Sequence, residues 1–276
     1  MIDIILAPFE FWFMNRAFFI MFIISLPTAL LSCYLVLKGW SLIGDAISHS
    51  VLPGIVIAYL INIPLIIGAF SAGMICALTA GFLSENSRIK RDTVLGIVFS
   101  GMFGLGIVLY TKIKTDVHLD HILFGNMLGI DINELFTAGL ISLGVSLLLL
   151  AKRKDYLLTT FDPIQAQASG LSVTLLHYSL LAMISLTIVA TLSAVGIILS
   201  IGLIIAPGSI AFLLTKRFEL MILISVLVTW VSSFIGLYIS FFIDSAPAPT
   251  IILVLTSFFI IAFIRTSLTQ SKTVEK

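Results

Sequence analysis

Charged residues are scarce in this sequence. Asp, Glu, Lys and Arg make up 11% of its 276 residues, whereas a soluble domain carries about a quarter. Hydrophobic residues make up 59% and the mean hydropathy is +1.19, so we expect an integral membrane protein. The formal net charge of +1 and the scattered basic residues exclude the basic stripe of a nucleic-acid-binding surface, so no nucleic-acid partner is expected.

The sequence also lacks the patterns of several other classes of protein. Cys33 and Cys76 lie in apolar runs without CxxC spacing, which excludes a disulfide framework and a thiolate metal site. There is no GxxxxGK[ST] loop for ATP, no HExxH motif of a metalloprotease, and no nucleophile paired with a base. We therefore expect no enzymatic activity in this chain. Acids precede the first arginine, Arg16, so we also expect no cleavable signal peptide.

Nine apolar runs approach the length, about 20 residues, that crosses a bilayer. They cover residues 17–37, 44–61, 64–83, 93–111, 134–151, 176–194, 195–214, 219–242 and 248–266. Only SAVG, residues 193–196, separates the sixth from the seventh, so eight crossings with a re-entrant segment are the alternative. No internal repeat or soluble domain interrupts the series. The sequence predicts an all-α polytopic membrane protein in which residues 1–276 form one transmembrane domain.

Lysine and arginine sort to one side of these nine runs. Three basic residues, Arg16, Lys112 and Lys114, fall on one side and twelve on the other. Because short cytoplasmic loops retain basic residues, the side with twelve of them is predicted to be cytoplasmic. This puts the C-terminus inside and the N-terminus outside. The aromatic residues within 1–16 predict a segment along the outer interface before the first span. The twelve are Lys38, Arg88, Lys90, Arg91, Lys152, Arg153, Lys154, Lys216, Arg217, Arg265, Lys272 and Lys276.

An acid and a histidine stand together where the second run begins, in GWSLIGDAISHSVLPG. Asp45 and His49 are four residues apart, which places both side chains on one face of a helix. A carboxylate with an imidazole suits manganese, ferrous iron or zinc, but two ligands are an incomplete site, so a second copy or a related subunit has to supply the others. Small residues nearby, such as Ser48 and Gly54, allow a close helix approach. The alternative is that Asp45 caps the helix and His49 is an interfacial histidine.

Several longer motifs resemble one family of transport proteins. LKGWSLIGDAISHSVLPG resembles a signature of the permease subunits of bacterial metal importers of the ATP-binding-cassette (ABC) class. The likeness continues through RDTVLGIVFSGMFGLGIVLYT (residues 91–111), HILFGNMLGI (121–130), FDPIQAQASGL (161–171) and AVGIILSIGLIIAPGSIAFLLT (194–215). Within that family the chain is most similar to the second permease of chelated iron and manganese systems.

The resemblance implies roles for particular residues. Asp45 and His49 are then metal ligands in the translocation path. Residues 162–170 are the cytoplasmic coupling helix that docks on the ATPase, and Asp162, Pro163, Gln165 and Gly170 are its coupling residues. Asp162 suits its cap, Pro163 its first helical position and Gly170 its end. Pro207, in IIAPGSIAF, is a candidate gating position, and an ordinary proline kink is the alternative.

A loop on the predicted outer side holds further ligand-type residues: Asp116, His118, Asp120 and His121. These side chains would guide metal ions or contact an extracytoplasmic binding protein, and a simple solvated loop is the alternative. His177 is interpreted as interfacial and Asp244 as a solvated acid at a helix end.

The function implied by the resemblance is the transmembrane subunit of an ATP-driven importer in the bacterial inner membrane. Its cargo is a divalent transition metal, manganese, ferrous iron or zinc, and no resident cofactor is expected. The expected partners are an ABC ATPase, a second permease or a second copy, an extracytoplasmic metal-binding protein and membrane lipid. A stand-alone ion-coupled carrier or channel is the alternative, although such a carrier would usually show an inverted repeat and more buried acids.

Overall fold

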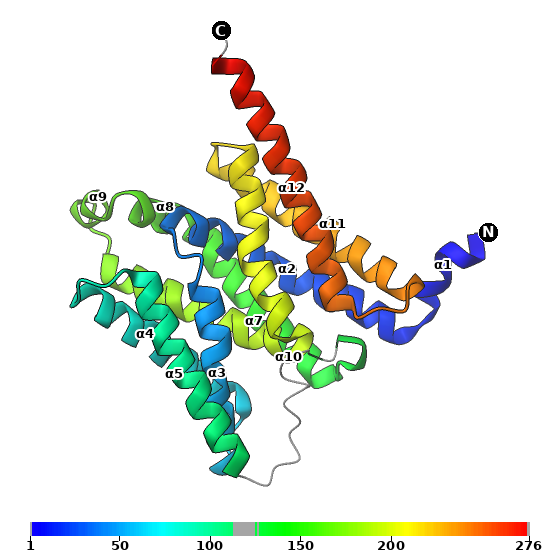
Figure 1. The fold of residues 1–276 in the computed structure, drawn as a ribbon, viewed down its shortest axis with the longest axis horizontal. Helices are drawn as coiled ribbons and strands as arrows, with labels where there is room; N and C mark the ends of the chain where they lie inside the picture. The colour runs from blue at the N-terminus through cyan, green and yellow to red at the C-terminus, as the bar shows by residue number, and fades with distance from the viewer. Residues whose placement is uncertain (1, 113–124, 126, 275–276) are drawn as a thin grey trace.

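The computed structural model describes residues 2–112, 125 and 127–274, and within these ranges every regular element is a helix (Figure 1). The all-α prediction is therefore confirmed. The helices are α1 (Ile2–Glu10), α2 (Trp12–Lys38), α3 (Ile43–Leu60), α4 (Leu65–Glu85), α5 (Arg91–Lys112), η1 (Met127–Gly129), α7 (Ile132–Ala151), α8 (Arg153–Phe161), α9 (Pro163–Ala168), α10 (Val173–Leu214), α11 (Phe218–Phe242) and α12 (Pro247–Val274).

Eight of these helices are long and apolar enough to cross a membrane: α2, α3, α4, α5, α7, α10, α11 and α12. The 42-residue α10 would extend about 63 Å if it were straight, roughly twice the thickness of the hydrocarbon core. Its backbone is non-helical at Gly196, where φ is 80° and ψ is 172°, and Figure 1 shows its two arms running in different directions. The predicted sixth and seventh runs are thus the two arms of α10, and the break falls on the last residue of SAVG.

The N-terminal boundary differs from the sequence prediction. The first membrane helix begins at Trp12 rather than near residue 17, so the predicted segment 1–16 contains both α1 and the first turn of α2. Phe11, between the two helices, has an extended backbone that separates them. Aromatic stacking holds α1 against the bundle, because the Phe9 ring lies 5.2 Å from Phe18 and 6.3 Å from Phe234.

The centre of the bundle is formed by α2, α3 and α10, each with 72% of its apolar window buried. In contrast, only 17% of the α5 window is buried. Large apolar side chains on the outer helices are exposed, for example Phe136 at 70% and Leu253 at 67%. Such exposure would be unfavourable in water but suits helices that face lipid tails.

Glycine brings α3 and α4 into backbone contact. A Cβ atom at Gly54 would lie 2.1 Å from the carbonyl oxygen of Gly68, and one at Gly68 would lie 2.2 Å from that of Gly54. Small residues allow this because they let backbones approach in a medium where apolar burial gives little net attraction between helices. The close approach positions the first half of α3, which carries Asp45 and His49, between α4 and α5.

Basic residues gather at the helix ends on one side of the bundle. Lys38 and Arg91 both lie over the indole ring of Trp40, and Arg153 donates to Glu219 over 2.7 Å. Tyr34 links the C-terminal end of α2 to the start of α8, because its hydroxyl donates to the Arg153 carbonyl. We call this layer, which holds the C-terminal end of α2 and the N-terminal ends of α5, α8 and α11, the basic end.

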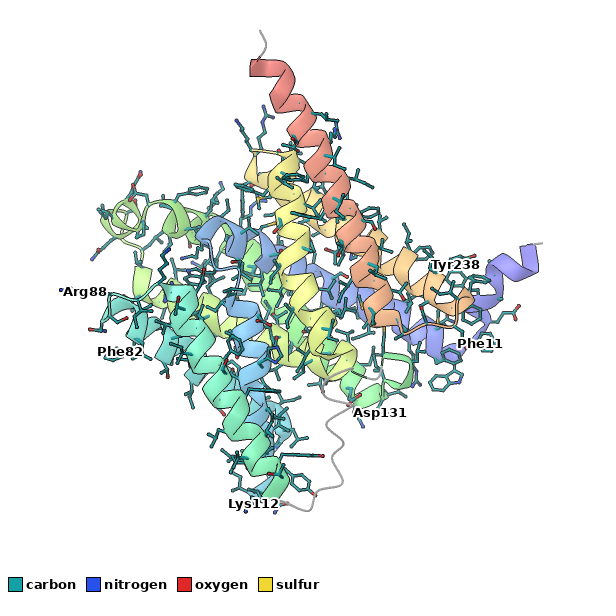
Figure 2. All side chains as sticks on the ribbon, viewed as in Figure 1. Phe11, Phe82, Arg88, Lys112, Asp131 and Tyr238 are labelled. Atoms are coloured by element: carbon teal, nitrogen blue, oxygen red, sulfur yellow. The ribbon has the colours of Figure 1, made fainter. Side chains whose placement is uncertain are left out.

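The opposite side of the bundle holds Arg16, whose guanidinium donates to the Ile130 carbonyl over 3.4 Å. Figure 2 shows Arg88, in the turn between α4 and α5, and Lys112 at opposite ends of this helix pair. The basic residues placed here, Arg88 on one side and Arg16 and Lys112 on the other, thus lie at the helix ends where the sequence analysis puts them.

Gly54→Ala is expected to lower the free energy of unfolding by about 1–3 kcal/mol, because the added methyl group overlaps the Gly68 carbonyl. Gly81→Ala, on the open side of α4, is the matched control, since a Cβ atom there meets nothing within 4 Å and alanine favours a helix by up to about 1 kcal/mol. Denaturant-induced unfolding of the purified protein measures the free energy of unfolding of each variant. Equal midpoints for the two variants would contradict the packing argument.

Candidate metal-translocation site

Asp45 and His49 lie on one face of α3, as their spacing predicts. The Nε2 atom of His49 is 3.3 Å from the Oδ1 atom of Asp45, and the two side chains are about 30% exposed, at 29% and 31%. The capping alternative does not fit, because α3 begins after Leu42 and no side chain caps its first turn. Asp45 lies inside that turn, where a negative charge is favoured by the helix dipole. The pair therefore presents one oxygen and one nitrogen ligand at the same edge of α3.

Two phenylalanine rings of α5 enclose the His49 imidazole. Phe99 stacks on it with centroids 5.7 Å apart, and Phe103 meets it edge-on at 5.3 Å. Helix α5 approaches α3 this closely because Gly106 faces Pro53, whose nitrogen would lie 2.9 Å from a Cβ atom at that position. The rings fix the plane of the imidazole and exclude water from one side of it. The sequence analysis did not identify these residues, although their four-residue spacing on one apolar face was the available signal.

The pair alone is an incomplete metal site. Within the described residues no group of three or more His, Cys, Asp or Glu side chains is close enough to hold an ion. The hydroxyls of Ser48 and Ser50 are buried and donate to carbonyls of their own helix. The small residues expected to allow close approach do so within the chain, where Gly54 packs against α4. Further ligands have to come from water or another chain.

The exposed face of α5 adjoins the pair. Gly96, Gly101 and Gly104 have nothing within 4 Å of the position that a Cβ atom would occupy. Phe99 and Phe103 alternate with these glycines along the same helix, so the open surface and the rings around His49 belong to neighbouring faces. The carboxylate and imidazole thus lie beside a surface that a second helix can approach closely.

Other candidate residues lie elsewhere. Asp116, His118, Asp120 and His121 are outside the described residues. His177 begins α10 at the basic end, with its ring edge-on to Trp40 at 5.2 Å, which agrees with the interfacial interpretation. Asp244 lies just after α11, next to its C-cap Ile243, and has a left-handed backbone with φ at 51°.

The predicted coupling segment is a short capped helix, α9. The Asp162 carboxylate accepts the Gln165 N–H over 2.9 Å, and Pro163 occupies the first helical position. At the other end Gly170 has φ of 82°, its N–H donates to the Gln167 carbonyl, and the following N–H of Leu171 donates to the Ala166 carbonyl. This pair of bonds is a Schellman ending, so the local geometry predicted for residues 162–170 is confirmed.

Two large apolar side chains at this segment have no cover. Ile164 is 82% exposed and Phe161 is 67% exposed. Figure 1 shows α8 and α9 projecting beyond the long helices of the bundle, so these two exposed side chains belong to a segment outside it. An exposed patch of this kind marks a protein interface.

Pro207 lies in the second arm of α10, where α2 approaches. The N–H of Gly208 donates to the Ser32 hydroxyl over 2.8 Å, and the same hydroxyl donates to the Ile205 carbonyl over 3.1 Å. A Cβ atom at Gly208 would lie 2.5 Å from the Ser32 backbone, so glycine allows α2 and α10 to come into backbone contact there. A gating role for Pro207 stays a prediction.

These features together define a class of protein: a polytopic membrane protein with an acid–histidine pair on one of its membrane-spanning helices and a short capped helix outside the bundle. The chain belongs to the ABC 3 transport family, whose model matches residues 10–266. It is therefore a permease subunit of an ABC transporter and not an enzyme, and the ATPase of such systems is a separate chain.

Characterised relatives cover nearly the whole chain. The chelated iron transport system membrane protein YfeD of Yersinia pestis is 52% identical, over 95% of this chain and 88% of the relative. The manganese transport system membrane protein MntB of Synechocystis is 46% identical, over 94% of this chain and 85% of the relative. A solved structure, PsaBC from Streptococcus pneumoniae in complex with Fab, matches with a TM-score of 0.86 and 33% identity over 95% of both chains.

Proposed function

We propose that this chain is the transmembrane subunit of an importer that moves manganese or ferrous iron into the cytoplasm. The observation that carries the proposal is the Asp45–His49 pair, with its two ligand atoms 3.3 Å apart inside an otherwise apolar bundle. An ionisable pair on a membrane-spanning helix is energetically costly and is expected to serve a transported ion. The names of the relatives supply the class of ion, iron and manganese.

The chemistry of the pair explains why such a site selects transition metals. A carboxylate offsets the large cost of dehydrating a dication in a low-dielectric medium, which neutral ligands alone would not offset. An imidazole nitrogen favours manganese, ferrous iron and zinc over calcium and magnesium, which prefer oxygen. The metal is cargo, so the site has to release it, and a small number of protein ligands suits reversible binding.

A second permease, either a related subunit or a second copy, completes the site. Its expected contact is the open face of α5, because Gly96, Gly101 and Gly104 allow a helix to approach beside His49. Two such subunits related by an axis along the membrane normal would bring two Asp45–His49 pairs together, which gives four protein ligands. An extracytoplasmic binding protein delivers the metal to the outer surface.

The ATPase docks on α9. Both ends of this helix are capped, so it is a rigid element. Its exposed Ile164, together with Phe161 at the end of α8, fills an apolar groove of the ATPase. The segment leads directly into α10, so a movement of α9 is transmitted to the first arm of that helix. The bend at Gly196 and the proline at Pro207 are the places where α10 can change direction.

The basic end faces the cytoplasm of the bacterial inner membrane. This orientation follows from the twelve basic residues predicted on that side, several of which the structure gathers around Trp40 and Glu219. It puts the N-terminus outside and the C-terminus inside. Family membership favours the ABC importer over the alternative of a stand-alone ion-coupled carrier or channel.

Asp45→Ala or His49→Ala, in a reconstituted whole transporter, is expected to lower metal uptake at least about tenfold, since each removes a direct ligand. Asp244→Asn is the control, because it removes a distant acid at a position whose left-handed backbone asparagine tolerates. Uptake of radioactive manganese is measured with the amount of assembled complex. If an assembled Asp45→Ala transporter takes up as much manganese as the wild type, the pair does not lie in the metal path.

Ile164→Asp is expected to abolish capture of the ATPase subunit, because it places a charge in the apolar contact of α9. Ile164→Leu keeps the apolar volume and should retain capture. Co-purification of the ATPase with the permease measures both. If Ile164→Asp captures as much ATPase as Ile164→Leu, the docking surface lies elsewhere.

Single-cysteine labelling tests the orientation. The native Cys33 and Cys76 are fully buried, so they give little background. In right-side-out membrane vesicles, a membrane-impermeant maleimide should label Ile63→Cys, in the α3–α4 turn, and should label Ser87→Cys, at the basic end, only after permeabilisation. The reverse pattern would invert the proposed topology.

A further inference from the structure

The imidazole of His49 has an aromatic ring on each of two sides. The Phe99 ring lies nearly parallel to it, at an angle of 25°, and the Phe103 ring meets it at 79°. These phenylalanines are four residues apart, so both side chains project from one face of α5. The Nε2 atom of the same imidazole lies 3.3 Å from the Asp45 carboxylate, and 29% of the His49 side chain is exposed. The imidazole is therefore confined by apolar groups but still accessible.

Packing toward both ends of α5 holds these rings in place. Leu95, in the first turns of the helix, is only 2% exposed. Further along, Gly106 meets α3 so closely that a Cβ atom there would lie 2.9 Å from the Pro53 nitrogen. Phe99 and Phe103 lie between these two contacts, and Phe99 also packs against the buried core. Withdrawal of the rings from His49 therefore requires a movement of the whole helix.

An apolar wall beside a metal ligand acts differently on different ions. A water molecule held against apolar surface loses hydrogen bonds, which costs free energy. Mg²⁺ dehydrates reluctantly and usually keeps several of its waters when a protein binds it. Manganese and ferrous iron accept an imidazole nitrogen in place of water. The wall beside His49 therefore disfavours an ion that keeps its waters more than one that exchanges them for His49 and Asp45.

We propose that Phe99 and Phe103 are specificity-determining residues of the Asp45–His49 site. Their rings hold the imidazole in one plane and provide no hydrogen-bond partner for hydration water on that side, so the site binds Mn²⁺ or Fe²⁺ in preference to Mg²⁺. This inference rests on the proposed function, because it requires that the pair binds the transported ion. It adds a requirement for dehydration, set by side chains that are not ligands, to the preference of the ligands themselves.

A purely structural role for the two rings predicts a different result. If Phe99 and Phe103 only support the fold around His49, their loss weakens the binding of every ion that uses the pair by the same factor. If they act as the apolar wall, their loss admits hydrated ions, so the affinity for Mn²⁺ falls relative to that for Mg²⁺. The ratio of the Mg²⁺ Kd to the Mn²⁺ Kd separates the two roles.

The test measures metal binding by the whole transporter, purified with its second permease and ATPase and kept free of nucleotide. Mn²⁺ binding is followed by the loss of the electron paramagnetic resonance signal of the free ion, with Mg²⁺ added as competitor. Binding that persists in Asp45→Ala is subtracted. Phe99→Ala and Phe103→Ala should each lower the Kd ratio about tenfold, since residues that orient a metal ligand typically contribute about 10- to 100-fold in metal affinity.

Matched variants test the apolar wall itself. Phe99→Leu and Phe103→Leu keep an apolar side chain at each position and should retain most of the ratio. Phe103→Gln keeps much of the volume but introduces polar groups, so it should lower the ratio even where an alanine variant does not assemble. Phe82→Ala is the control, because it makes the same truncation at a ring that is 66% exposed near the end of α4, at the rim of the bundle (Figure 2).

The possible outcomes separate this inference from the proposed function. An equal loss of affinity for both ions in the alanine variants gives the rings a structural role only and overturns the inference. A ratio that stays at the wild-type value, or that falls as far in Phe82→Ala, also overturns it. If the wild type binds no more Mn²⁺ than Asp45→Ala does, the proposed function fails, and the inference fails with it.

Discussion

The structure depends on one constraint: backbone polar groups in hydrocarbon have no water to bond with. Helices satisfy this requirement along almost the whole described chain, and buried hydroxyls such as Thr28 and Ser200 donate back to carbonyls of their own helices. The exception is Gly196, where α10 leaves the helical conformation. There the backbone is covered by another segment, since a Cβ atom at Gly125 would lie 2.3 Å from the Gly196 nitrogen. Irregular backbone at membrane depth is thus buried in protein.

The same constraint explains how the Asp45–His49 pair is tolerated. Asp45 and His49 contact each other, and His49 contacts two aromatic rings, so neither polar group points into lipid alone. They remain about one third exposed at a face where glycines of α5 leave open space. A pair of side chains that is partly exposed in one subunit fits the proposal that a second permease completes the site.

Several features of the candidate site could be predicted from local sequence. Four-residue spacing put Asp45 and His49 on one face, and the run from Asp162 to Gly170 encoded both ends of α9, because capping depends on side chains within a few residues. The rings of Phe99 and Phe103 could not be assigned to His49 in the same way. Their contact depends on the distance between α3 and α5, which is set by Gly106 against Pro53.

The sequence by itself determined the class of environment, the number and approximate limits of the apolar runs, and the sorting of basic residues, because hydropathy and charge act residue by residue. Only the tertiary structure decided that the sixth and seventh runs are arms of one helix broken at Gly196, and that Lys38 and Arg91 share Trp40. Both depend on contacts between segments distant in sequence. Lipid tails are as apolar as the side chains, so hydropathy does not specify which helices meet, and close packing at small residues does.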